Sequence, residues 1–335
     1  MNGSGIVALD LNDGNAGFAL YSQHHDGEIR KYEFLDDSWT GGFGDDVVVS
    51  SNARNGTPLM ALSYVIRDEL IWRLFYVDVN DTLQEKINSN KTRSGWTDGL
   101  LGNGGFKVSS SPQVGLSACR NYRWYGAPYN ISDFGIRLYY GGDDHAIHEL
   151  LWSYGNQAWD TGTVFDDSNG DGGVECTAGP SQPPGITNLW LLNSKGELEQ
   201  RWYDFNDTSR SPDHLTSTWV KGFTYPHVRK NSAITAITSI GPGQPKLVHF
   251  QLANNTVRQL VTTGVAETSE WTEYLDIEER PAIPNSRLGS VVLSTDRGGG
   301  KVHVFCQTNG TDITDFIRTL VSDNWFIQSV PTGPA

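Results

Sequence analysis

Two Arg–Glu pairs share one spacing along the chain. Arg73 precedes Glu85 and Arg137 precedes Glu149, each by twelve residues, with turn-forming residues at the midpoint. Residues equidistant from the turn of an antiparallel hairpin become cross-strand neighbours. We therefore expect two cross-strand Arg–Glu pairs. A single exposed pair would be a surface salt bridge contributing about 0–1 kcal/mol, but finding the same pair twice at one register favours a ligand site.

A long loop is unusually rich in aromatic residues. The segment CRNYRWYGAPYNISDF contains Tyr122, Trp124, Tyr125, Tyr129 and Phe134. Such a loop could close as a lid over a flat, apolar ligand. A long loop also needs a small hydrophobic cluster of its own. Both interpretations stay open at this point.

Other arrangements that could do chemistry are weaker. Asp167, Asn169 and Asp171 mimic the first half of a calcium loop, but Ala178 stands where the bidentate glutamate is expected. The adjacent His24 and His25 lie at an expected exposed turn, where acid–base work is a minor alternative. The sequence contains no GxSxG and no CxxC motif. We expect no metal and no cofactor.

Cysteine usage gives little sign of a disulfide framework. Cys119, Cys176 and Cys306 are few and far apart. Buried free thiols are the default expectation. A Cys119–Cys176 bridge remains open if the chain meets an oxidising compartment.

A Trp recurs six times in a similar setting, as WTGG, WTDG, WDTG, WVKG, WTEY and WFIQ. Before each Trp lies a hairpin pattern of two alternating apolar and polar runs around an Asn, Asp or Gly turn. Before each hairpin lies a short apolar segment. The hairpins span 18–34, 72–87, 136–152, 188–203, 246–261 and 301–316, and the apolar segments span 6–11, 59–65, 114–119, 173–178, 233–240 and 290–294.

Six repeats of four strands predict an all-β, six-bladed β-propeller. We expect residues 1–335 to form one propeller domain, since each blade buries its faces against its neighbours. The composition agrees: 37 Gly and 37 aromatic residues (11 Trp, 13 Tyr and 13 Phe) suit short strands and tight turns. Each repeated Trp could simply cover the hairpin of its own blade.

Charge and sequons bear on partners and location. The net charge of −14 argues against nucleic acid, and no run of 18 apolar residues predicts a membrane span. Eight N-x-Ser/Thr sequons exceed the roughly three or four expected by chance. We expect a secretory or extracellular glycoprotein whose leader is absent from this chain, although turns are rich in these residues anyway. The sequons are Asn2, Asn55, Asn80, Asn90, Asn130, Asn206, Asn254 and Asn309.

Several segments resemble the fungal fucose-specific lectins of the orange-peel-mushroom type. They are IRLYYGGDDHAIHELLW with Trp159, WRLFYVDVNDTLQE with Trp96, SWTGG at Trp39 and the C-terminal VPTG. The similarity runs over all six repeats and is most specific in blades 2 and 3. Those lectins are six-bladed propellers, which agrees with the repeat analysis.

The resemblance implies sugar pockets between blades, built from an Arg and a Glu on the central hairpin and from aromatic residues. Blade 2 keeps Arg73 and Glu85 with Trp96, and blade 3 keeps Arg137 and Glu149 with Trp159. Charge-assisted hydrogen bonds would grip sugar hydroxyls. The other blades depart from the pattern, with Ala19 and Lys31 in blade 1, Asn188 and Gln200 in blade 4, Leu247 and Gln259 in blade 5 and no such pair in blade 6. At most two of five sites are expected to be intact.

Relatives of this propeller also include hetero-Diels–Alderases of fungal tropolone–sesquiterpenoid biosynthesis. Membership of that branch would make this chain a cofactor-independent pericyclase joining a tropolone quinone methide to a humulene-type alkene. Arg137 would be the catalytic donor, and Tyr122 and Trp124 would hold the terpene. The alternative is a secreted fucose-binding lectin with fewer sugar sites. The partner is then a fucosylated glycan instead of these small molecules, and a homodimer stays open.

Overall fold

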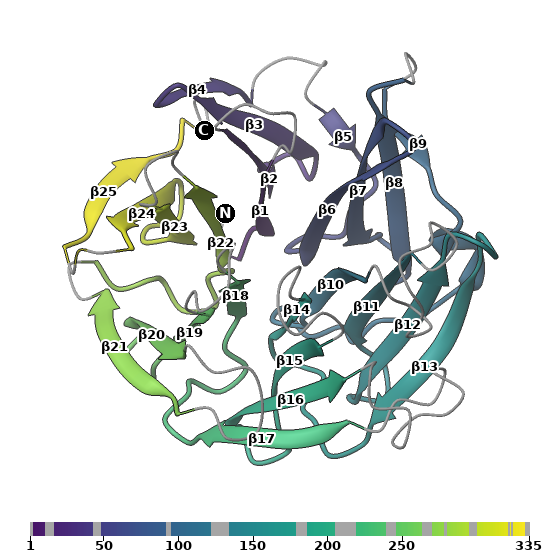
Figure 1. Cartoon of the computed structure of the whole chain (residues 1–335). Coiled ribbons are helices and arrows are strands. Elements are labelled where there is room, and N and C mark those ends of the chain that lie inside the picture. The colour runs from purple at the N-terminus through teal and green to yellow at the C-terminus, as the bar shows by residue number, and fades with distance from the viewer. Residues whose placement is uncertain are drawn as a thin grey trace. The chain divides into compact units, whose positions relative to one another are not determined.

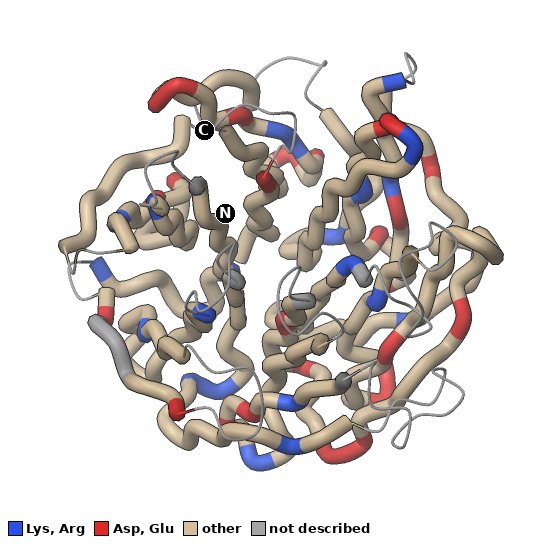
Figure 2. Tube along the Cα trace, in the orientation of Figure 1, with Lys and Arg blue, Asp and Glu red and all other residues tan. Residues whose placement is uncertain are grey.

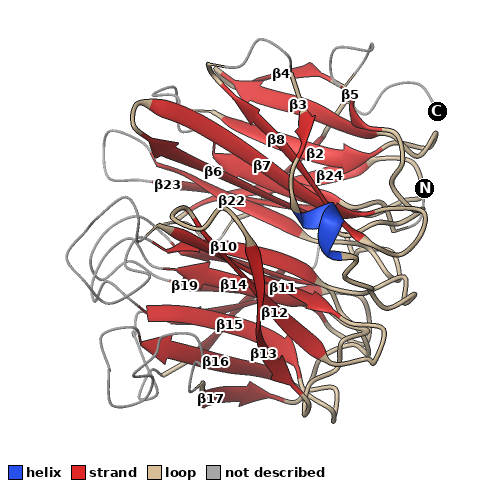
Figure 3. Ribbon diagram, turned by 90° about the vertical axis from the view of Figure 1, so that its right-hand side faces the viewer, coloured by secondary structure: helices blue, strands red, loops and turns tan. Residues whose placement is uncertain are grey.

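The computed structural model describes residues 3–10, 17–42, 48–91, 95–121, 134–178, 186–204, 219–238, 246–262, 270–277, 280–294, 300–320, 322 and 324–331. Strands dominate these residues. Within the described ranges the helix is limited to one turn of 3-10 helix, Leu101–Gly104 (Figure 3). No helix in this part of the chain is long and apolar enough to cross a membrane.

The strands form six antiparallel sheets, each a meander in chain order (Figure 1). We call these sheets blades 1 to 6. The six expected apolar segments are the first strands of the blades, and the six expected hairpins are their second and third strands, as predicted. Each repeated Trp lies in the fourth strand or just before it.

The blades fall into two compact units. The first unit, Met1–Phe106 with Asn254–Val257 and Leu275–Ala335, contains blades 1, 2 and 6. Blade 1 consists of β1 (Ile6–Asp10), β2 (Phe18–Gln23), β3 (Ile29–Leu35) and β4 (Ser38–Gly41), with β5 (Val48–Ser50) added beside β3. Blade 2 consists of β6 (Leu59–Ile66), β7 (Glu69–Val77), β8 (Leu83–Ser89) and β9 (Thr97–Asp98). Blade 6 consists of β22 (Gly289–Ser294), β23 (Gly300–Gln307), β24 (Ile313–Thr319) and β25 (Phe326–Ser329).

The second unit, Lys107–Ala253 with Arg258–Tyr274, contains blades 3, 4 and 5. Blade 3 consists of β10 (Leu116–Asn121), β11 (Gly135–Gly141), β12 (Ile147–Ser153) and β13 (Trp159–Phe165). Blade 4 consists of β14 (Val174–Ala178), β15 (Ile186–Leu192), β16 (Leu198–Asp204) and β17 (Val220–Tyr225). Blade 5 consists of β18 (Ile234–Thr238), β19 (Lys246–Gln251), β20 (Val257–Thr262) and β21 (Thr272–Ile277).

The core of each unit lies between successive blades. Strands β2 and β11 are buried at every position, whereas β4 has no buried residue and β13 has only one, Phe165. Strand β2 has blade 2 packed on one face and blade 6 on the other, so its polar residues are buried along with its apolar ones. The hydrophobic clusters lie between blades 1 and 2, 1 and 6, 3 and 4, and 4 and 5.

Tight turns join the strands where the chain has two consecutive residues with positive φ. Asp36 and Asp37 (φ 50° and 57°) connect β3 to β4, and Arg67 and Asp68 (φ 48° and 60°) connect β6 to β7. Positive φ at both central residues is the type I′ geometry that matches the twist of a hairpin.

Charged residues are dispersed along the described chain. Lys and Arg are scattered among acidic and neutral segments instead of forming one basic stripe (Figure 2).

Candidate functional site

The blade 3 pair is a buried ion pair between neighbouring strands. Arg137 on β11 donates through Nη1 to Oε1 of Glu149 on β12, and both side chains are 0% exposed. The residue directly opposite Glu149 is Tyr139, so the two partners are diagonal neighbours and not directly opposed as expected. Their long side chains span the diagonal. This burial rules out an exposed surface salt bridge.

Three donors fix the Glu149 carboxylate. Besides Arg137, the Tyr139 hydroxyl donates to Oε1 at 2.9 Å, and the Thr163 backbone N–H donates to Oε2 at 3.0 Å. Burial alone would lower the pKa of Arg137, but the adjacent Glu149, Tyr139 and Tyr203 more than offset this, so the pKa of Arg137 lies above its usual value. The Arg137 guanidinium therefore stays charged.

The aromatic cover of this pair comes from blade 4. The Arg137 guanidinium lies 5.0 Å from the ring centre of Tyr203 on β16. Trp219, just before β17, contacts Tyr139 at 6.0 Å and Tyr203 at 5.8 Å between ring centroids. Trp159, expected to be the aromatic partner, lies at the start of β13 opposite Trp152. The aromatic residues at this pair are therefore Tyr203 and Trp219, which the sequence reasoning missed.

The blade 2 pair has the same register. Arg73 on β7 donates through Nη1 to Oε1 of Glu85 on β8 at 2.6 Å, and Phe75 is the residue opposite Glu85. Arg73 Nε also donates to the Tyr64 hydroxyl at 2.7 Å. Its side chain is 7% exposed, slightly more than that of Arg137.

The repeated Trp residues cover the preceding blade within each unit. Trp96 of blade 2 packs edge-on against Tyr21 of blade 1, at 5.8 Å between centroids. Trp271 of blade 5 packs in the same way against Trp190 of blade 4, at 6.2 Å. Trp39 and Trp219 also contact their own hairpins, at Phe34 (5.0 Å between ring centroids) and Tyr203 (5.8 Å). The fourth strand is the outermost of its blade, so a side chain beside it can reach the hairpin of the preceding blade.

A glycine three positions after Trp makes room for the hairpin acid. A Cβ atom at Gly99 would lie 2.1 Å from Glu85 Oε2, and one at Gly162 would lie 2.6 Å from Glu149 Oε2. Gly222 has the same relation to Gln200, at 2.9 Å from Oε1. The W-x-x-G pattern in the sequence was therefore a usable signal for the position of the acid.

Three positions lack the Arg–Glu chemistry, as the sequence predicted. In blade 4, Gln200 donates to Asn188 Oδ1 at 2.8 Å and accepts from Trp271 Nε1 at 3.2 Å, which makes a neutral amide pair. In blade 1, Lys31 pairs with Glu33, and Ala19 offers no polar group. In blade 5, Gln259 contacts His249 at 3.0 Å, and the position corresponding to Arg137 is Leu247.

Blade 6 lacks an Arg–Glu pair, as the sequence predicted, but it contains a different buried pair at the same spacing. His303 and Asp315 are twelve residues apart, and His303 Nδ1 lies 3.0 Å from Asp315 Oδ2 with both side chains buried. Gln328 replaces the glycine three positions after Trp325 and donates to Asp315 at 2.8 Å. Phe18 of blade 1 lies 5.0 Å from the His303 ring. The Arg–Glu pattern does not reveal the His303–Asp315 pair, because its residue types differ.

Part of the predicted site lies outside the described residues. This holds for Tyr122 and Trp124 of the proposed lid and for the sequons Asn2, Asn130 and Asn206. Phe134, at the end of the lid segment, is buried and packs edge-on against Trp152 at 6.3 Å. The remaining sequons, Asn55, Asn80, Asn90, Asn254 and Asn309, are all exposed.

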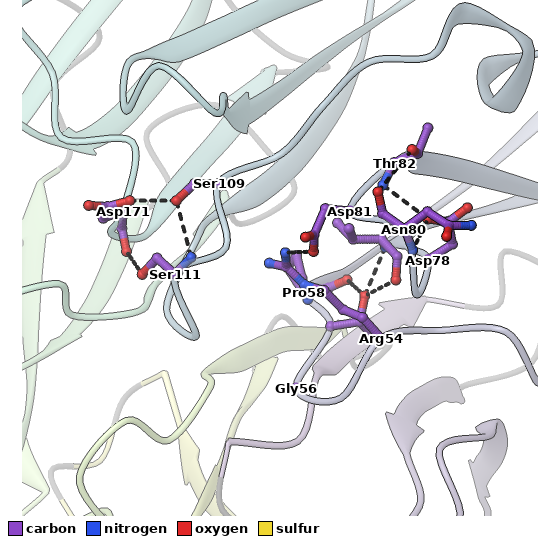
Figure 4. Close-up of polar contacts among 12 residues, drawn as sticks. Arg54, Gly56, Pro58, Asp78, Asn80, Asp81, Thr82, Ser109, Ser111 and Asp171 are labelled. Carbon is purple, nitrogen blue, oxygen red and sulfur yellow. Dashed lines mark hydrogen bonds and ion pairs between the residues drawn. The ribbon is translucent and has the colours of Figure 1, made fainter.

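The calcium-like segment is divided between two networks. Asp167 pairs with Arg201 at 2.6 Å and with Lys221; burial would raise its pKa, but these cations lower it to about 2. Asp171 instead accepts from Ser109 at 2.5 Å and contacts His145 at 2.8 Å (Figure 4 shows Ser109, Ser111 and Asp171). Among the described residues, no group of three His, Cys, Asp or Glu could hold a metal ion.

His24 and His25 lie between β2 and β3, and His148 lies on β12. His24 contacts Asp26 at 2.8 Å and His25 at 3.0 Å. His148 contacts Asp144 and is partly exposed, whereas the adjacent Glu149 is buried, so the two side chains lie on opposite faces of β12.

The fungal fucose-specific lectin profile matches residues 2–325. The chain belongs to this family. No curated protein matches it. Similar solved structures include a mutant Aleuria aurantia lectin in complex with α-methyl-L-fucoside, which is 22% identical with a TM-score of 0.78 and coverage of 99% of this chain and 97% of that one. AofleA from Arthrobotrys oligospora is 19% identical with a TM-score of 0.75 and coverage of 99% and 88%.

A bacterial lectin, BP39L from Burkholderia pseudomallei, is more distant, with 13% identity, a TM-score of 0.62 and coverage of 97% and 84%. The Aleuria aurantia lectin has a six-bladed β-propeller fold. The predicted fold class is thereby confirmed: this chain is a six-bladed β-propeller with four antiparallel strands per blade, one of which carries an added strand.

Proposed function

We propose that this protein is a fucose-binding lectin with no more than two working sugar sites, at Arg137–Glu149 and at Arg73–Glu85. The observation that carries the proposal is that both blades keep the Arg–Glu ion pair, its diagonal register and the glycine that makes room for the acid. Family membership and the fucoside bound to the Aleuria aurantia lectin support the same ligand class.

The chemistry of the pair suits adjacent hydroxyls. A guanidinium donates and a carboxylate accepts, so together they complement a sugar that presents both roles on neighbouring oxygens. At blade 3, Tyr203 and Trp219 would contact the apolar side of the ring. Because Arg137 is enclosed there, sugar entry requires the aromatic cover to shift.

The test is a calorimetric titration with L-fucose or α-methyl fucoside. The wild type should bind, the Arg73→Ala and Arg137→Ala variants should each lose one site, and the double variant should lose both. Lys86→Ala is the matched control, because Lys86 pairs with the 80% exposed Asp98 in blade 2 and lies outside the site. Absence of wild-type binding at millimolar fucose would refute the lectin proposal.

A second candidate is the hetero-Diels–Alderase function. Its specific support is the enclosure of Arg137 between Tyr139, Tyr203 and Trp219, since a charged donor is worth more in a water-poor aromatic site than in water. Arg137 would donate to the quinone-methide oxygen as negative charge grows there. One such donor can supply about 3 kcal/mol, roughly a hundredfold in rate.

This second candidate has its own test. Purified protein, a tropolone quinone-methide precursor and a humulene-type alkene are combined with EDTA present. We would expect a higher yield and a changed stereochemical ratio relative to a protein-free control. Identical yield and ratio would exclude the enzyme for that substrate pair.

We also propose that the chain passes through a secretory pathway. The five described sequons are exposed and so are available for glycosylation. Expression in a eukaryotic secretory host should give a mass that falls on treatment with an N-glycosidase. An unchanged mass would refute glycosylation.

A further inference from the structure

Two thiols meet where the first strands of blades 3 and 4 pack together. Cys119 on β10 is 5% exposed and Cys176 on β14 is 4% exposed, and both belong to one hydrophobic cluster with Tyr139. The Cys176 sulfur lies 3.7 Å from Oγ of Ser117, which is two residues before Cys119 on β10. The two groups are therefore close neighbours although 57 positions separate them in the sequence.

Backbone contacts hold the two strands beside each other. The Gly115 N–H donates to the Gly172 carbonyl at 2.8 Å, and the Cys176 N–H donates to Ser117 Oγ at 2.9 Å. Because side chains alternate along a strand, Ser117 and Cys119 share one face of β10. That face is the one turned toward Cys176 on β14.

We propose that Cys119 and Cys176 form a disulfide that ties blade 3 to blade 4. The co-reactant is a small disulfide of the glutathione class. One cysteine thiolate attacks a sulfur of oxidised glutathione and releases glutathione thiolate, and the second cysteine then displaces the attached glutathione. The cysteines lose two electrons and two protons, and two glutathione thiols are formed.

The packing also indicates when the bridge forms. Burial, the neighbouring Cys119 and Glu175 raise the pKa of the Cys176 thiol, so it stays protonated in the folded reduced protein. A protonated, buried thiol reacts slowly with disulfides. Exchange should therefore occur while β10 and β14 are still docking, and only slowly once they are packed.

The bridge would lie beside the blade 3 ion pair, on the neighbouring strand β10. Cys119 is the register partner of Arg137 across β10 and β11. Tyr139, in contact with the cysteine cluster, donates to Glu149. A covalent link here would fix the spacing between the blade that carries Arg137 and the blade that carries Tyr203 and Trp219.

The test is a thiol count that does not depend on ligand binding. The protein is unfolded in reductant, refolded in a glutathione redox buffer, denatured in acid and alkylated without reductant. We expect one label per chain, on Cys306, and three labels after reduction. A non-reduced digest should contain the peptides of Cys119 and Cys176 linked together.

Variants make the count specific. Cys306→Ala should give no label before reduction and two labels after it, and Cys119→Ser should give two labels under both conditions. If Cys119→Ser does not fold, the numbers of labels on wild type and on Cys306→Ala still show whether the Cys119–Cys176 disulfide forms. Three labels on refolded wild type, glutathione left on Cys119 or Cys176, or a bridge that includes Cys306 would each overturn the proposal.

Discussion

Removing one side chain from the Arg137–Glu149 pair would leave a buried charge without its partner. Both side chains are fully buried, and the carboxylate accepts three hydrogen bonds. Breaking such a pair by deleting one partner costs about 3–5 kcal/mol. The pair therefore bears on folding as well as on ligand binding.

We predict that Glu149→Ala lowers the free energy of unfolding by about 3–5 kcal/mol. The measurement is urea denaturation followed by tryptophan fluorescence. Asp98→Ala is the control, because Asp98 is 80% exposed in its pair with Lys86 and should change stability by about 0–1 kcal/mol. Equal losses in the two variants would mean that Glu149 is not enclosed.

We predict that Gly162→Ala destabilises the protein by about 1–3 kcal/mol. The new Cβ would lie 2.6 Å from Glu149 Oε2, and Arg137, Tyr139 and Thr163 prevent that carboxylate from moving away. Gly222→Ala is the matched control, because it meets the neutral Gln200 amide at 2.9 Å. A control variant as unstable as Gly162→Ala would show that the fixed carboxylate is not the cause.

At the residue scale, the sequence predicted which Arg and Glu would pair, but it did not predict the residues that surround each pair. The spacing of twelve correctly brought Arg73 to Glu85 and Arg137 to Glu149. It could not reveal the diagonal register, which depends on where the turn residues lie, nor the cover by Trp219, which comes from another blade. His303 and Asp315 were overlooked because their side chains differ in type while their geometry is the same.

At the scale of the elements, the sequence predicted the positions of the strands but not how deeply each strand would be buried. Turn residues and alternating runs marked the hairpins, because those signals are local. The second strand β2 is buried at every position, since blades 2 and 6 cover its two faces. That effect arises only from packing between repeats, and it explains how polar residues such as Arg137 become buried.

Strand β14 has a consequence for pH dependence. Glu175 on β14 accepts a hydrogen bond from Ser117 at 2.9 Å, and burial raises its pKa from 4.5 to about 8. Between these two values the folded state binds more protons than the unfolded state, so stability falls as the pH rises. The decline should occupy the range from about pH 5 to about pH 8 and should stop above it.

We predict that Glu175→Gln removes this decline. The free energy of unfolding of wild type and variant is measured by urea denaturation at about pH 5, 6.5 and 8. The variant should gain stability relative to wild type as the pH rises. Parallel profiles would show that Glu175 does not carry the raised pKa.

For the whole molecule, the repeat pattern predicted six blades because each repeat contains the same local signals. It also predicted that residues 1–335 form one domain, and this stays a prediction. Substitutions in individual repeats decide how many sugars the molecule could hold. Avidity depends on that number, because several weak sites acting together bind a surface more tightly than one.

We predict a stoichiometry of two fucose molecules per chain by native mass spectrometry. Arg73→Ala and Arg137→Ala should each reduce it to one, after circular dichroism has shown that each variant is folded. Agglutination of fucosylated cells should be weak, since two sites give little avidity. Three or more bound fucose molecules would contradict the assignment of the other blades as non-binding.

The cover that Trp219 of blade 4 gives to blade 3 has a consequence for synthesis on the ribosome. Tyr139 of blade 3 is covered by Trp219, which is translated 80 residues later. At about 5–20 residues per second, the aromatic face of blade 3 waits about 4–16 s for its cover. During this interval the nascent chain exposes the aromatic face of blade 3, and this is where a chaperone would be needed and where a stalled chain would aggregate.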